Sequence, residues 1–195
     1  MLRLKMKTDP RWVKHVAEKN IEEILTDHAW CEQKAASSAI SLIVQYPEHT
    51  ELVQHMTELA QEEMSHFQMV HDEIQKRGYT LGPERKDSYV NELVKFIRVK
   101  GKTQAQSLAD KLLFAAMIEA RSCERFSVLS QNIEDQELSA FYHDLMVSEA
   151  RHYTLFIKLA RELCPEVDVD KRWQDFLEYE GEVISRYGKS EAIHG

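Results

Sequence analysis

Two segments of the sequence carry a glutamate followed three residues later by a histidine, Glu63-Met-Ser-His66 and Glu149-Ala-Arg-His152. In a helix, residues three apart lie on the same side, so both side chains of each pair can reach one ion. Carboxylate oxygens and imidazole nitrogens are ordinary ligands of transition metals. One such pair alone is weak evidence, because glutamate and histidine are also common on helix surfaces.

Each of these glutamates lies in the middle of an apolar face when its segment is drawn as a helix, and so do Glu32 and Glu119. On its face, Glu119 has Leu112, Ala115 and Phe126 as neighbours. A buried lone carboxylate costs several kcal/mol unless it is paired, protonated or bound to a metal. The sequence therefore predicts metal ligands rather than four misplaced charges.

The spacing of the glutamates repeats along the chain. Glu32 precedes Glu63 by nearly the same number of residues as Glu119 precedes Glu149. Each half then has one helix with a single glutamate and a second helix with Glu-x-x-His, which is the ligand set of di-iron or di-manganese carboxylate bundles. The predicted ligands are Glu32, Glu63, His66, Glu119, Glu149 and His152. Such carboxylate-rich sites suit iron or manganese better than zinc.

The elements that must position these residues are helices. The 195 residues include only 6 Gly and 4 Pro, and the stretches 11–46, 48–77 and 102–164 contain neither. Stretches of that length without helix breakers favour helix. The expected spans are 10–25, 27–46, 48–77, 88–99, 104–132, 134–163 and 170–187. Thr26 or Asp27 is expected to cap the second span.

Composition places the chain among globular proteins. With 43% apolar and 30% charged residues, it is neither disordered nor membrane-spanning in type. Three widely spaced cysteines and the absence of a signal-like N-terminus predict reduced thiols and a cytoplasmic location. The net charge of −8 argues against a general nucleic-acid coat but leaves room for a local basic patch. We expect one all-α domain over 1–195, with four long helices forming a bundle.

Four segments together resemble the bacterial tRNA isopentenyladenosine hydroxylase family: EILTDHAWCEQKAASSA, LAQEEMSHFQMV, IEARSCERF and SEARHYTLF. The resemblance runs from about residue 8 to residue 188. That family is similar to ferritin-like di-iron monooxygenases. The resemblance therefore implies a ferritin-like four-helix bundle with additional flanking helices, two iron ions held by the same six residues, and O2 as co-substrate.

The activity implied by the resemblance is hydroxylation of the isopentenyl side chain of (2-methylthio-)N6-isopentenyladenosine next to the anticodon. The base lies in a single-stranded loop, where it can be splayed out toward a protein. Two alternatives remain open at this point: a ferritin-like protein that oxidises and stores iron, and a helical interaction domain without metal. The oligomeric state also remains open.

Further residues are assigned roles around this centre. Aromatic side chains are expected to line an apolar substrate pocket: Phe67, Phe126, Tyr142, Tyr153 and Phe156. The resemblance to other di-iron monooxygenases marks Glu62 and Arg151 as residues that orient the ligand imidazoles. Ser65 departs from the arginine of that pattern.

Contacts to the tRNA anticodon loop are expected from a basic cluster formed by Lys95, Arg98, Lys100 and Lys102, with a second cluster at the N-terminus. The acidic C-terminal helix is expected to lie away from the RNA. The chain has neither a glycine-rich dinucleotide fingerprint nor clustered cysteines, so the electrons for oxygen chemistry must come from a separate reductase.

Overall fold

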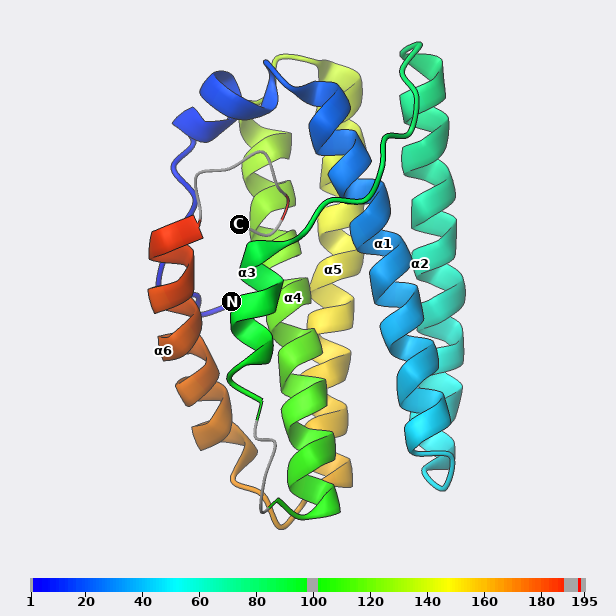
Figure 1. Ribbon diagram of the computed structural model, residues 1–195, viewed down its shortest axis with the longest axis vertical. Helices are drawn as coiled ribbons and strands as arrows, with labels where there is room; N and C mark the ends of the chain where they lie inside the picture. Colours follow the sequence, from blue (N-terminus) through cyan, green and yellow to red (C-terminus); the bar gives the residue numbers. More distant parts are fainter. Residues whose placement is uncertain (1, 98–101, 188–192, 194–195) are drawn as a thin grey trace. The chain divides into compact units, whose positions relative to one another are not determined.

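The computed structural model describes residues 2–97, 102–187 and 193, and every regular element in this part of the chain is helical (Figure 1). A short π-helical turn, η1, is followed by six α-helices. Their bounds are η1 Val13–Ala17, α1 Ile21–Gln45, α2 Thr50–Lys76, α3 Ser88–Val94, α4 Gln104–Asn132, α5 Gln136–Leu163 and α6 Val169–Tyr187. The all-α prediction is confirmed for the described residues.

Side-chain caps account for where several helices begin. Thr103 and Gln106 form a reciprocal capping box at the start of α4. The carboxylate of Asp135 accepts hydrogen bonds from the backbone N–H groups of Glu137 and Leu138 at the start of α5. These bonds satisfy N–H groups that have no partner within the helix, and they fix the entry of the two longest helices of the chain.

The N-terminal region differs from the prediction of helices over 10–25 and 27–46. Only the turn Val13–Ala17 precedes α1, and α1 continues without a break through Thr26 and Asp27, which are buried. Neither residue is a cap. The carboxylate of Asp27 instead accepts a hydrogen bond of 2.7 Å from the backbone N–H of Ile193. The side chain of Asp27 bonds to this distant backbone group instead of capping a helix end, and α1 continues through it.

The chain divides into two compact units, one of which comprises residues 19–86 together with Ile193. Here α1 and α2 form an antiparallel hairpin (Figure 1). The segment that follows α2 is held against α1, where the indole of Trp30 donates to the carbonyl of Gly82 at 2.9 Å. A side chain at Gly82 would come within 3.3 Å of Thr26, so this close approach favours glycine.

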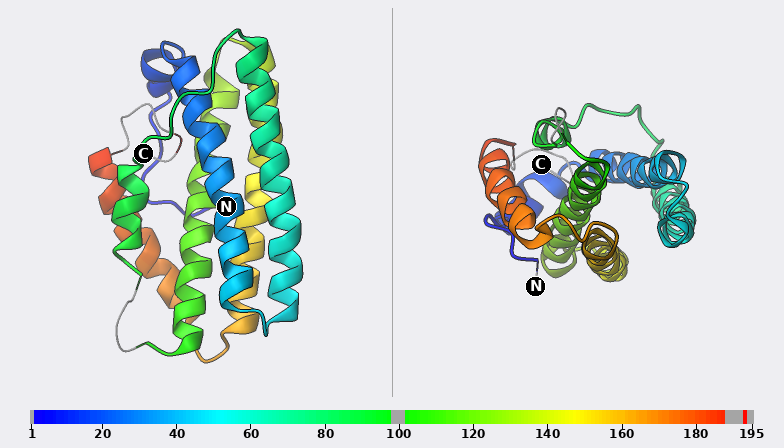
Figure 2. Two further views of the ribbon diagram at one scale, coloured as in Figure 1. Left: turned by 45° about the vertical axis from the view of Figure 1, so that its right-hand side comes forward. Right: turned by 90° about the horizontal axis from the view of Figure 1, so that it is seen from below.

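The other unit comprises the described residues of 2–18 and 87–187. Here α4 and α5 form the second long hairpin, and α3 and α6 lie beside α4 (Figure 2). A fully buried ion pair joins α4 to α6, because Arg121 donates to Glu180 from both Nε (3.0 Å) and Nη2 (2.5 Å). Tyr89 of α3 donates to the same carboxylate at 3.2 Å, so three helices meet at one charge cluster.

Candidate metal centre

The α1–α2 hairpin carries one buried set of metal-ligand types. Glu32 comes from α1, while Glu63 and His66 come from successive turns of α2, and all three are buried. One ligand atom from each lies within 4.8 Å of the others. His66 Nδ1 is 3.1 Å from Glu63 Oε2 and 3.7 Å from Glu32 Oε2. As helix geometry predicted, the Glu-x-x-His spacing places both side chains on the same side of α2, close to one another.

The electrostatics of this set favour an ionised carboxylate. Burial opposes ionisation of Glu32, but its interactions with His28 and His66 outweigh burial and hold its pKa well below the usual value. Burial alone would lower the pKa of His66, but Glu32 and Glu63 raise it to about 9. The two carboxylates therefore favour a positive charge at this point, and a bound metal cation would supply that charge in place of the proton on His66.

His28 is a residue of this set that the sequence did not assign. Its Nε2 donates to Glu32 Oε1 at 2.6 Å, and its side chain is fully buried. A hydrogen bond of this kind fixes the orientation of a ligand carboxylate. The signal in the sequence is the spacing of four between the two residues, but a histidine on an apolar face has many roles besides this one.

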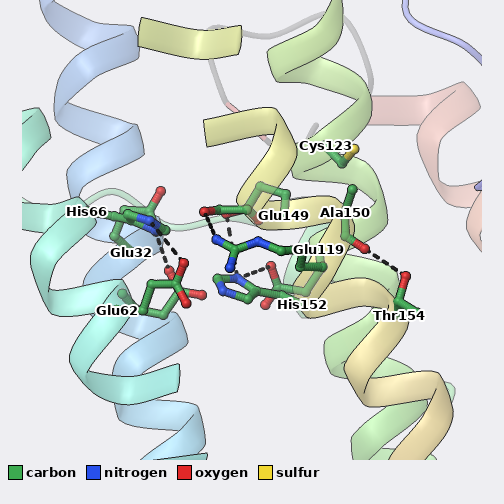
Figure 3. Close-up of polar contacts among 12 residues, drawn as sticks. Glu32, Glu62, His66, Glu119, Cys123, Glu149, Ala150, His152 and Thr154 are labelled. Atoms are coloured by element: carbon green, nitrogen blue, oxygen red, sulfur yellow. Dashed lines mark hydrogen bonds and ion pairs between the residues drawn. The ribbon is translucent and has the colours of Figure 1, made fainter. Parts of the chain in front are cut away.

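Glu62 was predicted to orient the ligand imidazole of α2. Its Oε1 lies 3.8 Å from His66 Nε2, and its side chain remains partly exposed. Figure 3 shows His66 beside both Glu32 and Glu62. The distance is that of an ion pair rather than a hydrogen bond.

The α4–α5 hairpin carries a second buried set with the same composition. Glu119 comes from α4, and Glu149 and His152 come from α5 (Figure 3). One ligand atom from each again lies within 4.8 Å of the others. His152 Nδ1 is 3.8 Å from Glu119 Oε2 and 4.0 Å from Glu149 Oε1. These separations exceed hydrogen-bond length, and the three side chains together could hold a metal ion.

Arg151 was predicted to orient His152. Its guanidinium donates to the hydroxyl of Ser148 at 2.8 Å, and Ser148 immediately precedes the ligand-type residue Glu149. The arginine therefore bridges one turn of α5 along its own helix. Its effect on the imidazole stays a prediction.

Both sets offer two carboxylates and one imidazole in a buried environment, and each could bind a metal ion. Burying such carboxylates is costly without a compensating cation. Oxygen-rich sets with a single imidazole fit iron or manganese better than the tetrahedral sulfur and nitrogen sites of zinc.

Comparison with known proteins connects this ligand pattern to a family. Residues 2–195 match the family described as tRNA-(MS[2]IO[6]A)-hydroxylase (MiaE). The chain belongs to this family. The resemblance found in the sequence motifs is thereby confirmed over nearly the whole chain.

Two curated relatives carry the name tRNA 2-(methylsulfanyl)-N(6)-isopentenyladenosine(37) hydroxylase. The one from Pseudomonas putida is 41% identical, over 83% of this chain and 77% of that protein. The one from Salmonella typhimurium is 28% identical, over 91% of this chain and 82% of that protein. Both are similar to this member of the family along most of their length.

A solved structure is similar in fold. It is described as protein 43 with aldehyde deformylating oxygenase activity from Synechococcus, and it is 33% identical to this chain. The match covers 98% of this chain and 95% of that one, with a TM-score of 0.88. The fold of this family member is therefore ferritin-like, as the resemblance implied.

No helix among the described residues has the length and apolar character needed to span a membrane.

The five aromatic residues assigned to a substrate pocket fall into three places. Phe126 and Tyr142 are buried between α4 and α5 with ring centroids 5.4 Å apart, and Phe156 is buried on α5. Phe67 of α2 stacks on its own helix, 6.2 Å from the ring of His71. Tyr153 lies beside Trp173 of α6, as described below. Contact of any of the five with a substrate stays a prediction.

The basic cluster assigned to tRNA is only partly described. Lys95 follows α3, is exposed, and pairs with Glu92 of that helix. Lys102 is half-buried just before α4. Arg98 and Lys100 lie outside the described residues. Contact of these four residues with RNA stays a prediction.

Proposed function

We propose that this protein hydroxylates the isopentenyl side chain of (2-methylthio-)N6-isopentenyladenosine next to the anticodon of tRNA, using O2 and external electrons. Membership of the hydroxylase family and 41% identity to a curated hydroxylase support the substrate and the reaction. The observation that carries the proposal is the pair of buried Glu/Glu/His sets, one on each long hairpin.

In this proposal the two sets hold two iron ions. The ligands are Glu32, Glu63 and His66 on the first hairpin, and Glu119, Glu149 and His152 on the second. Bound ferrous iron would supply electrons for the activation of O2. A fold neighbour with an oxygenase activity supports oxygen chemistry on this architecture.

The protein's own residues have three tasks in this reaction. His28 holds the carboxylate of Glu32 in one orientation through a 2.6 Å hydrogen bond. Burial of all six ligand-type residues excludes water, which protects reactive species from wasteful quenching. Apolar neighbours such as Phe126 offer a surface suited to a prenyl chain.

The proposed partners are the tRNA anticodon loop and a separate reductase, and the place of the reaction is the cytoplasm. The loop contacts are proposed for Lys95, Arg98, Lys100 and Lys102. A bundle of carboxylate ligands contains no carrier that could deliver two electrons from a nicotinamide cofactor, which is the reason for the reductase.

The test is a single-turnover reaction with isotopically labelled O2. Chemically reduced, iron-loaded protein is mixed with prenylated tRNA, and the digested nucleosides are analysed by mass spectrometry. One labelled oxygen atom in the prenyl chain is the expected result. Label only in water, with iron oxidised and the nucleoside unchanged, would refute the proposal and favour iron oxidation for storage.

A further inference from the structure

A cavity of about 710 Å³ lies between α5 and the start of α6, and Arg3 of the N-terminal segment also lines it. This volume is within the usual range for pockets that hold a small molecule or one unit of a polymer. Its lining combines basic and aromatic side chains, namely Arg3, Lys158, Arg161, Lys171, Tyr153 and Trp173. All of them belong to the same compact unit of the chain.

The charge of this lining is opposite to that of the protein. Four of the lining residues are cationic, and Asp170 is the acidic residue among them. Arg161 pairs with Asp170 at 2.5 Å and Lys158 pairs with Glu162 at 3.5 Å, so the excess of positive charge comes from Arg3 and Lys171. In a chain of net charge −8, a concave surface of this sign favours an anionic ligand.

Arg3 lines the cavity, and the segment that carries it is anchored by contacts with α4 and α6. Its φ of 61° lies in the left-handed region, and it is the one non-glycine residue with positive φ in the described part of the chain. The residues that follow are anchored: Arg121 donates to the carbonyl of Met6 at 3.1 Å, and a side chain at Gly181 would come within 3.0 Å of Lys5. Strain of this kind persists where the surrounding contacts determine the conformation, and it is typical of functional positions.

The aromatic part of the lining is a pair of rings. Tyr153 of α5 is half-buried, and its ring centroid lies 5.8 Å from that of Trp173, which is buried on α6. Arg3 and Arg161 line the same cavity, so this pair of rings lies beside two guanidinium groups. Cations beside a supported aromatic ring are the combination with which proteins bind single-stranded nucleic acid.

The position of Tyr153 separates this cavity from the ligand set. His152 precedes it directly, and successive residues of a helix point about 100° apart. One side chain belongs to the Glu119 set and the next to the cavity. A ligand here would therefore lie on a different face of α5 from the reacting atoms.

We propose that this cavity binds one nucleotide of the tRNA substrate other than the modified one. Lys158, Lys171 and Arg3 bind its phosphates, and its base stacks on Tyr153. The inference rests on the proposed function for the identity of the RNA. Arg172, which follows Lys171 on α6, donates to the carbonyl of Phe96 at 2.8 Å, and Phe96 follows Lys95 of the predicted basic cluster.

The experiment measures binding of a synthetic anticodon stem-loop that lacks the prenyl group, over a series of salt concentrations. The charge variant is K158Q/K171Q. The matched control is K76Q/K19Q, which removes the same charge from exposed positions; Lys76 has a neighbouring glutamate at 3.8 Å, as Lys158 has at 3.5 Å. The stacking variant is Y153L, which keeps an apolar side chain. Iron content is measured for every protein.

Each phosphate contact changes the slope of log affinity against log salt by about 0.7–0.9. Two lost contacts should reduce the slope by about 1.4–1.8 and weaken binding about 25- to 60-fold at 0.1 M salt. Y153L should weaken binding about ten-fold with an unchanged slope, because stacking is not an ionic contact. The control should bind like the wild type, and iron content should be unchanged throughout.

Equal affinities and slopes for the wild type, K158Q/K171Q and K76Q/K19Q would overturn the inference, and so would failure of the wild type to bind the RNA. If the three proteins bind the RNA equally and the prenyl chain is still hydroxylated, the proposed function remains supported and the role of the cavity is refuted. If the variants lose RNA affinity as expected but the wild type forms no hydroxylated product, the cavity stands and the proposed function fails.

Discussion

Replacing Glu119 by glutamine should remove the metal ion of one set and leave the fold intact. The carboxylate of Glu119 is buried, and its ion-pair distance to His152 is 3.8 Å, too long for a hydrogen bond. A neutral amide of the same shape avoids the cost of burying a charge. The metal-free variant should therefore be at least as stable as the metal-free wild type.

With metal bound, the wild type and Glu119→Gln should differ in Tm. An ion present at 100 times its dissociation constant stabilises the folded state by about 2.7 kcal/mol, so two ions contribute about 5.4 kcal/mol. For a domain of this size, 1 kcal/mol corresponds to about 2–4 °C, which gives a rise of about 11–22 °C in the Tm of the wild type. Glu119→Gln loses one ligand of one set and should show about half of this rise.

The assay is thermal unfolding under anaerobic conditions, with and without ferrous iron, together with metal analysis after gel filtration. Glu137→Gln is the matched control, because Glu137 is exposed in the first turn of α5, the second helix of the same hairpin. It should keep the full rise in Tm. A full rise and wild-type metal content in Glu119→Gln would refute the assignment of this residue as a ligand.

Three further predictions follow from single contacts. His28→Leu should weaken metal affinity about 10- to 100-fold in a metal titration, because a ligand carboxylate loses its orienting hydrogen bond; unchanged affinity would argue against that role. Arg121→Met should lower the free energy of unfolding by about 3–5 kcal/mol in urea, because Glu180 is left buried without its cation, and Arg121→Met/Glu180→Met should recover most of the loss. Burial raises the pKa of Cys123 and of Cys164 to about 11, so at pH 8 both should resist alkylation until the protein is unfolded. Mass spectrometry would count the modified thiols, and equal labelling in the folded and unfolded protein would contradict this expectation.

Local signals predicted the long helices well. The span 104–132 was predicted and is found as α4, and 134–163 was predicted where α5 covers 136–163. Both begin at caps whose partners lie two or three residues away, so the information is within the window that sequence inspection uses. The helix break predicted at Thr26 and Asp27 is wrong, because the partner of Asp27 is not within a few residues of it. The partner of Asp27 is the backbone of Ile193, at the other end of the chain.

The candidate ligands were predictable because helix periodicity acts on them directly. Glu63 and His66 come together on one face of α2, and Glu32 lies close to them because it is on the buried face of α1. His28 lies on the same face as Glu32, yet the sequence assigned it no role. A face pattern says which side chains point inward but not which of them form a hydrogen bond.

The cavity between α5 and α6 had no such signal. Lys158, Arg161 and Lys171 are spread over two helices and formed no predicted cluster, and Arg3, a member of the predicted N-terminal basic cluster, comes from the opposite end of the chain. The C-terminal helix was expected to lie away from RNA because of its acidic residues. Its first turn carries Lys171, however, and Glu180, one of those acidic residues, is buried against Arg121 rather than exposed to solvent. The charge that a helix presents to a ligand therefore depends on which of its carboxylates are neutralised in the core, and this is a property of packing that no count along the sequence contains.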